Sequence, residues 1–110
     1  MSKDIKERIS NSISEDRVVL FMKGTRDTPM CGFSAKVVEM LNSLQVEYKT
    51  YDVISDADLR SGIKEFSNWP TLPQLYIGGE FVGGCDIIKE MYENGELKKT
   101  FEEKKLSFKK

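Results

Sequence analysis

The chain has 110 residues, enough for one domain of ordinary size and too few for two. Its 17 basic and 18 acidic residues give a formal net charge of −1, so the composition does not indicate a partner among nucleic acids or anionic membranes. It contains no histidine, which excludes Cys–His and Ser–His catalytic pairs and most zinc sites. No apolar run approaches the roughly 20 residues of a membrane span.

The first half of the chain predicts a helix, a strand and a second helix. A stripe of isoleucines predicts the first helix, and the stretch RVVLFM (17–22) is typical of a buried strand. The stretch KGTRDTPM (23–30) predicts a loop, and the next helix starts at or just after Cys31. The apolar positions expected on the inner faces of these helices are Ile5, Ile9 and Ile13, and then Phe33, Val37, Leu41 and Leu44.

The middle of the chain predicts a second strand and a third helix. The strand is VEYKTYDV (46–53), and Ser55 or Asp56 is suited to cap the helix that follows. The inner face of that helix consists of Leu59, Ile63 and Phe66. A hairpin follows, with strands 73–77 and 80–84 joined by a Gly-Gly pair.

The last helical region begins near Asp86 and is interrupted at Gly95. The whole order predicts an α/β, thioredoxin-like fold: a four-stranded mixed sheet with helices on both faces. Its first strand–helix–strand unit should be parallel and right-handed. We expect residues 1–110 to form a single domain whose tail, from about residue 103, is a solvated end. The N-terminal stretch MSKDIKERIS resembles neither a signal nor a transit peptide, which predicts a cytoplasmic protein.

The chemically informative stretch is PMCGFS (29–34). In a Cys-x-x-Cys motif a second cysteine would occupy the position of Ser34, so Cys31 cannot form a disulfide within its own motif. Free N–H groups and the helix dipole at a helix N-terminus favour a thiolate, and Lys23 adds positive charge. The alternative is that Cys31 is a buried, inert cysteine packed as a small apolar residue.

The sequence resembles the monothiol glutaredoxins of the CGFS class. The resemblance is carried by FMKGT (21–25), CGFS (31–34), NWPTLPQLYIGGEFVGGCDI (68–87) and MYENGEL (91–97), in that order, within residues 5–100. It implies a glutaredoxin domain that binds glutathione, a tripeptide with two carboxylates and one amine. Cys31 is then the reactive thiol, and Phe33 belongs to the same binding site.

The resemblance also assigns residues to the first part of a glutathione site. Lys23 and Arg60 would bind the glycine carboxylate, with Lys64 as a weaker candidate one turn further on. Leu72 would offer its backbone to the glutathione peptide, next to a cis bond to Pro73. The alternatives are solvated surface charges for the three cations and an ordinary proline at the start of a strand.

The far end of the expected site is the start of the last helix. The backbone N–H groups of Cys85 and Asp86 would bind the γ-glutamyl carboxylate, and Asp86 could also accept a hydrogen bond from the amine. For Asp86 the alternative is an ordinary residue of the first helical turn. For Cys85, packing and a secondary redox role remain open.

A count of ligands connects the single thiol to an iron–sulfur cluster. A [2Fe–2S] cluster needs four ligands, and one subunit offers Cys31 and one glutathione thiol. A homodimer therefore completes the set, and the resemblance implies this arrangement, with apo iron–sulfur proteins and a BolA-like protein as partners. The alternatives are a glutathione-dependent thiol–disulfide oxidoreductase using Cys31, at most a weak one, and a redox-dead interaction domain. The CGFS pattern and the loop 23–30, which the resemblance implies is longer than that of efficient oxidoreductases, favour the cluster carrier.

Overall fold

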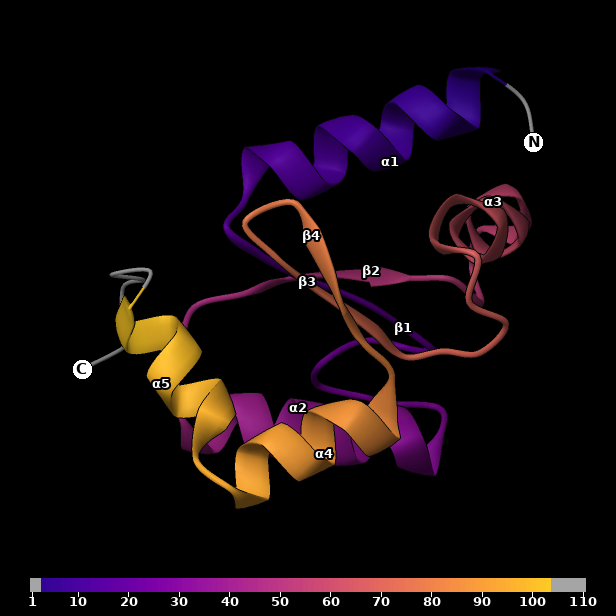
Figure 1. Ribbon diagram of the computed structural model, residues 1–110. Helices are drawn as coiled ribbons and strands as arrows, with labels where there is room; N and C mark the ends of the chain where they lie inside the picture. The colour runs from indigo at the N-terminus through magenta and orange to yellow at the C-terminus, as the bar shows by residue number, and fades with distance from the viewer. Residues whose placement is uncertain (1–2, 104–110) are drawn as a thin grey trace.

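The computed structural model describes residues 3–103, in which the strands form one sheet and the helices pack against it (Figure 1). The predicted tail lies almost entirely outside the described residues. The elements are α1 (Lys3–Glu15), β1 (Val18–Met22), α2 (Gly32–Ser43), β2 (Lys49–Asp52), α3 (Ala57–Ser67), β3 (Gln74–Ile77), β4 (Glu80–Gly83), α4 (Cys85–Glu93) and α5 (Glu96–Glu103).

The four strands form one mixed sheet in the order β2-β1-β3-β4. β1 pairs with β2 in parallel, with Met22 opposite Asp52 at the end of the pair. β3 runs antiparallel to β1 and β4 antiparallel to β3, joined by the predicted Gly78-Gly79 turn, in which both glycines have positive φ. The structure thus confirms the predicted thioredoxin-like fold.

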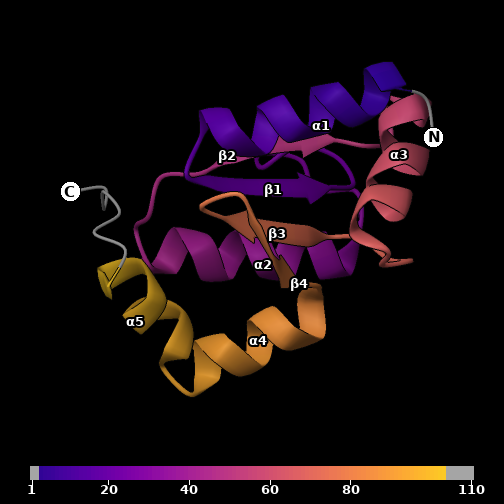
Figure 2. The same cartoon turned by 45° about the horizontal axis from the view of Figure 1, so that its top comes forward.

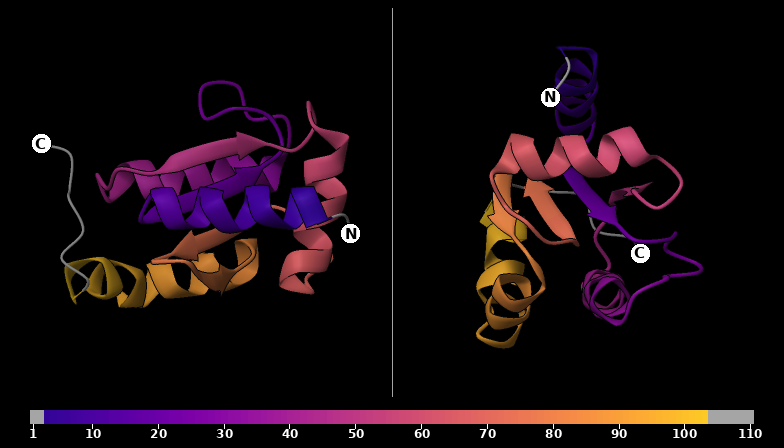
Figure 3. Two further views of the ribbon diagram at one scale, coloured as in Figure 1. Left: turned by 90° about the horizontal axis from the view of Figure 1, so that it is seen from above. Right: turned by 90° about the vertical axis from the view of Figure 1, so that its right-hand side faces the viewer.

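Helices cover both faces of the sheet (Figure 2). One face packs against α1 and α3, and its apolar cluster includes the isoleucine stripe of α1 together with Phe21 and Tyr76. Gly62 allows α3 to approach α1 closely, because a Cβ there would lie 2.8 Å from Cγ1 of Ile5. The other face packs against α2, α4 and α5, with Leu20 and Phe101 fully buried among them. Figure 3 shows α1 lying along the sheet and α3 running across its end.

The structure corrects two expectations about individual elements. The second strand is shorter than predicted, because only Lys49–Asp52 pair with β1. Phe33 does not belong to the inner face of its helix: its side chain is 58% exposed, whereas Val37 and Leu41 are fully buried. Of the two candidate caps, Asp56 is the N-cap of α3, and its carboxylate accepts a hydrogen bond from the backbone N–H of Leu59 at 3.1 Å.

Within residues 3–103, no helix combines the length and the apolar character that crossing a membrane requires.

Candidate functional site

A groove of about 460 Å³ opens where β1 ends and where α2 and α4 begin. Its walls come from three stretches of the chain that are far apart in sequence, within 23–33, 64–72 and 84–87. The residues that line it are Lys23, Cys31, Phe33, Lys64, Trp69, Pro70, Thr71, Leu72, Gly84, Cys85, Asp86 and Ile87. The fold therefore gathers two free thiols, two lysines and a carboxylate around one groove of the size of a small molecule.

Cys31 is the N-cap residue of α2, with extended backbone angles of φ −152° and ψ 137°. The thiol closes no capping hydrogen bond onto the helix. The backbone N–H of Ser34 nevertheless lowers the pKa of the Cys31 thiol and outweighs the opposing effect of burial. The N–H of Phe33, the charge of Lys23 and the Ser34 hydroxyl lower this pKa further. Cys31 is partly exposed and its environment favours the thiolate, so it has the chemistry of a nucleophile or a soft metal ligand and not that of a cysteine packed as an inert apolar residue.

Ser34 stands where a dithiol motif has its second cysteine, and it is fully buried. Its Oγ accepts a hydrogen bond from the backbone N–H of Lys23 at 3.1 Å. This bond ties the first turn of α2 to the residue that follows β1. Ser34 therefore fixes the thiol-bearing helix relative to the sheet.

The loop before Cys31 is closed by its own backbone. The N–H of Met30 donates to the carbonyl of Lys23 at 2.9 Å, and Thr25 and Thr28 exchange two backbone hydrogen bonds of 3.2 Å. Gly24 has φ +89°, and a Cβ there would lie 2.5 Å from the carbonyl oxygen of Thr28. Glycine is thus required at this position, and the closed loop brings Lys23 next to the thiol.

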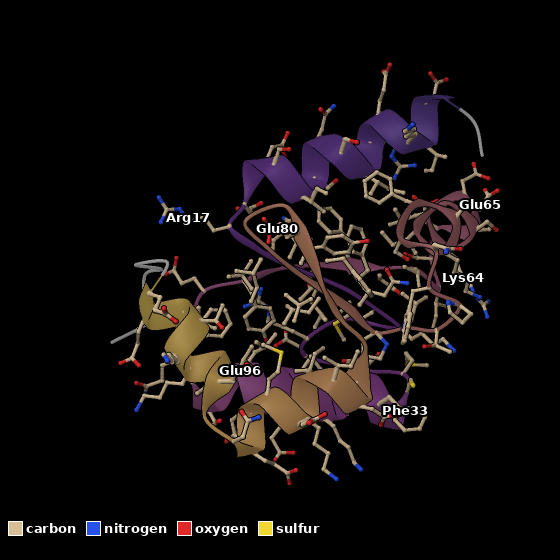
Figure 4. All side chains as sticks on the ribbon, viewed as in Figure 1. Arg17, Phe33, Lys64, Glu65, Glu80 and Glu96 are labelled. Carbon is tan, nitrogen blue, oxygen red and sulfur yellow. The ribbon has the colours of Figure 1, made fainter. Side chains whose placement is uncertain are left out.

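Helix α3 supplies the second lysine of the groove. Lys64 lines the groove and is half-buried, whereas Arg60, one turn earlier, is exposed and is not a lining residue. Figure 4 shows Lys64 and Phe33 on the same side of the molecule, on helices from opposite layers. The groove therefore lies between the two helical layers, at one end of the sheet.

The segment between α3 and β3 forms a further wall. The Leu72–Pro73 peptide bond is cis, as predicted. Gln74 is fully buried, and its Nε2 donates to the carbonyls of Trp69 and Thr71 at 3.2 Å each. One buried amide thus holds this loop against the end of the sheet, with Leu72 facing the groove.

The start of α4 faces the thiol. Gly84 is the N-cap residue, and a Cβ there would lie 3.0 Å from Nε1 of Trp69. The Trp69 Nε1 itself is buried without a hydrogen-bond acceptor among the described residues. Burial raises the pKa of the Cys85 thiol, and the negative charge of Asp86 raises it further. The two cysteines therefore differ: the environment favours a thiolate at Cys31 and a neutral thiol at Cys85.

Most of the predicted site residues lie together. Lys23, Cys31, Phe33, Lys64, Leu72, Cys85 and Asp86 all line the groove, whereas Arg60 and Pro73 do not. The lining residues Trp69, Pro70, Thr71 and Ile87 were not predicted from the sequence as site residues. For the first three, the available signal was their position directly before Leu72. Ile87 lies in the first turn of α4, and its side chain is 37% exposed.

The opposite pKa shifts predict an order of reaction. A thiol with a lowered pKa keeps its thiolate at lower pH, so Cys31 should react with iodoacetamide before Cys85 as the pH rises from about 6 to 9. Peptide mass spectrometry after timed alkylation measures both sites in one sample. Equal rates, or faster alkylation of Cys85, would contradict the assignment.

The fold and the groove define a class: thioredoxin-like proteins in which a single thiolate at a helix N-terminus faces a small-molecule groove. The glutaredoxin family model matches residues 18–82, which contain the thiol and most of the groove. The chain therefore belongs to the glutaredoxin family, and within it to the monothiol glutaredoxins.

Individual relatives support this assignment. The chain is 52% identical to the monothiol glutaredoxin ycf64-like protein of a Synechocystis strain, over 93% of this chain and 95% of that protein. It is 57% identical to the probable monothiol glutaredoxin 2 of Rickettsia typhi, over 86% of each chain. Its fold matches a truncated mutant of Trypanosoma brucei 1-C-Grx1 with a TM-score of 0.87 and 42% identity, covering 96% of both chains.

Proposed function

We propose that this glutaredoxin binds glutathione in the groove and, as a homodimer, carries a [2Fe–2S] cluster to apo iron–sulfur proteins. The observation that carries the proposal is the lone thiolate of Cys31 in a groove that has charged groups at both ends. Each end suits one charged end of the tripeptide. We place the activity in the cytoplasm, where reducing conditions keep Cys31 and Cys85 as the free thiols they are in the structure.

The groove supports the glutathione half of the proposal through its charge pattern. Lys23 and Lys64 are suited to the glycine carboxylate, and Arg60 extends this positive surface on α3. The N-terminus of α4, with the N–H groups of Cys85 and Asp86, suits the γ-glutamyl carboxylate. Leu72 and Pro73 lie between the two ends, where the backbone of Leu72 would pair with the peptide of the ligand.

The cluster would be cargo held by Cys31 and by the glutathione thiol. No group of three or more Cys, Asp or Glu side chains in residues 3–103 is placed to hold a metal ion, and the proposed ligand set draws on glutathione and a second subunit instead. The thiolate of Cys31 has the chemistry of a cluster ligand. The exposed side chains of Met30 and Phe33 flank it, so a second subunit would also cover apolar surface.

Anaerobic reconstitution with iron, sulfide and glutathione tests the function. The expected product is a coloured dimer with one cluster and two glutathione molecules, measured by absorbance and native mass spectrometry. Removing free glutathione by gel filtration should make the cluster labile, since half of its ligands are held without covalent bonds. A monomer that keeps its cluster with no glutathione bound contradicts the proposal. The same holo dimer is the reagent with which apo acceptors and a BolA-like partner are assayed.

A second candidate function is glutathione-dependent reduction of mixed disulfides, which the lowered pKa of the Cys31 thiol favours. We expect this activity to be weak, because Ser34 cannot supply a second thiol and the loop 23–30 differs from the shorter loop expected of an efficient oxidoreductase. The measurement is the coupled reduction of a small mixed disulfide with glutathione and its reductase. Turnover equal to that of a dithiol glutaredoxin would make the oxidoreductase function the primary one.

A further inference from the structure

Asp52 occupies the point where the two parallel strands separate. It is the last residue of β2 and pairs with Met22, the last residue of β1, and the N–H of Val53 donates to the carbonyl of Met22 at 2.9 Å. Beyond this point one chain continues into the loop 23–30 and Cys31. The other chain turns through residues 53–56 into α3. Both segments lead to walls of the groove.

One carboxylate oxygen of Asp52 binds both segments. Its Oδ1 accepts hydrogen bonds from the backbone N–H of Gly24 at 2.9 Å and from that of Ile54 at 2.8 Å. Burial opposes ionisation, but the N–H groups of Ile54 and Gly24, together with hydrogen bonds from Ser55, hold the pKa of Asp52 below its usual range. The Ser55 hydroxyl adds a hydrogen bond to the backbone carbonyl of Asp52 at 3.2 Å. The carboxylate therefore joins the two departing chains through charge-assisted hydrogen bonds.

Backbone hydrogen bonds link Gly24 to the segment that carries the thiol. Gly24 follows Lys23, whose carbonyl accepts from the N–H of Met30 at 2.9 Å and whose N–H donates to Ser34 at 3.1 Å. Met30 and Ser34 lie on either side of Cys31 in the chain. Displacing Gly24 would thus displace the backbone frame that sets the position of Lys23 and of the N–H groups facing the thiol.

From Ile54 the chain leads into α3, which forms the opposite wall of the groove. Two residues later Asp56 caps α3, and the same carboxylate forms an ion pair of 2.7 Å with Arg8 of α1. Helix α3 carries Lys64 into the groove. Asp52 therefore bridges the segments that carry both lysines of the groove.

The loop 23–30 has one other attachment to the neighbourhood of β2. The guanidinium of Arg26 lies over the ring of Tyr48, 4.2 Å from its centroid, and donates to the carbonyl of Tyr48. This contact holds the tip of the loop beside the start of the edge strand. At the base of the loop Asp52 binds the N–H of Gly24, the residue that follows Lys23.

We infer that Asp52 is a positioning residue: through Gly24 and Ile54 it sets the geometry of the Cys31 thiolate and the spacing of Lys23 and Lys64 for the tripeptide. The part that concerns glutathione rests on the proposed function. The positioning of the Cys31 thiolate is inferred only from the hydrogen bonds of Asp52 and Lys23.

The test exploits two effects of opposite sign. Removing a negative charge near a thiol lowers the thiol pKa, whereas displacing Lys23 and the N–H groups raises it. For Asp52→Ala we expect the midpoint of the Cys31 alkylation profile to rise by about 0.5 pH or more, a roughly threefold fall in thiolate at pH well below the midpoint. Asp52→Asn keeps an acceptor oxygen and should retain a pH midpoint at or below that of the wild type. Asp52→Glu keeps the charge but moves the acceptor, so it should behave like Asp52→Ala and serves if that variant does not fold.

The matched charge control is Asp27→Ala, which removes an exposed carboxylate of the same loop. It should leave the midpoint unchanged or slightly lowered. An unchanged or lowered midpoint in folded Asp52→Ala or Asp52→Glu overturns the inference, and so does a raised midpoint in Asp52→Asn.

Glutathione binding, measured by calorimetry on the same proteins, should weaken about tenfold in Asp52→Ala and recover in Asp52→Asn. If the wild type binds no glutathione, the proposed function fails, and the thiol profiles still decide whether Asp52 positions Cys31. Unaltered glutathione affinity in folded Asp52→Ala overturns the part of the inference that concerns the ligand.

Discussion

Cys31→Ser should abolish the cluster, the colour and the cluster-dependent dimer in anaerobic reconstitution. A serine hydroxyl at neutral pH has no thiolate to offer, so each subunit would lose its only proposed protein ligand. The fold should be retained, because Cys31 is partly exposed and caps α2 without a side-chain hydrogen bond. Absorbance, iron content and native mass would be compared with those of the wild type, and circular dichroism would check the fold.

Cys85→Ser is the matched control, since it removes the other thiol of the same groove. Its sulfur has a raised pKa, and the proposal uses the backbone N–H of this residue and not its thiol. We therefore expect Cys85→Ser to reconstitute a coloured dimer. Loss of colour in Cys85→Ser, with retention in Cys31→Ser, would reverse the assignment of the ligand.

Lys23→Gln should weaken glutathione binding by roughly ten- to a hundredfold, corresponding to about 1.5–3 kcal/mol for the loss of one charge-assisted contact. The substitution leaves the backbone hydrogen bonds of residue 23 in place, because they involve its N–H and carbonyl. It should also raise the pKa of the Cys31 thiol, since the positive charge of Lys23 lowers that pKa. Calorimetry with glutathione and the alkylation profile of Cys31 measure the two effects, and cluster retention should fall with the affinity.

Lys36→Gln provides the control for net charge, because Lys36 is an exposed lysine of α2 that does not line the groove. It should leave glutathione affinity within about twofold of the wild type. Equal losses in the two variants would show that general electrostatic attraction, and not a contact with Lys23, governs binding.

The fold could be predicted almost entirely from sequence, because its elements have clear periodic signals. The isoleucine stripe of α1 and the apolar run of β1 are both long enough and apolar enough to require burial in the core. The Gly-Gly pair fixed the hairpin. The start of β2 was harder to predict. Residues 46 and 48 are buried like strand residues, but they precede the pairing with β1. Burial and strand pairing are different properties, and hydrophobic pattern reports only burial.

The charged residues and cysteines of the site could be predicted from the sequence, whereas the residues that line the groove only through packing could not. Cys31, Lys23 and Asp86 could be chosen from chemistry and motif together, whereas Trp69 and Ile87 enter the groove because of how the loop and α4 pack. Phe33 shows the limit of periodicity. It continues the helical spacing of Val37 and Leu41, yet it lies in the first turn, beyond the core that those residues reach. Arg60 stays a prediction for the ligand-bound state.

The burial of Ser34 has a consequence for converting this protein into a two-thiol enzyme. A cysteine at that position would bring a larger atom and a weaker acceptor to a fully enclosed space, where the hydroxyl oxygen now accepts the N–H of Lys23 at 3.1 Å. Gaining a resolving thiol would therefore loosen the joint between strand and helix that orients the first one. Ser34→Cys alone would add a second thiol but weaken the hydrogen bond that positions Cys31. An evolutionary route to dithiol chemistry from this scaffold must therefore replace that link between strand and helix as well as add the cysteine.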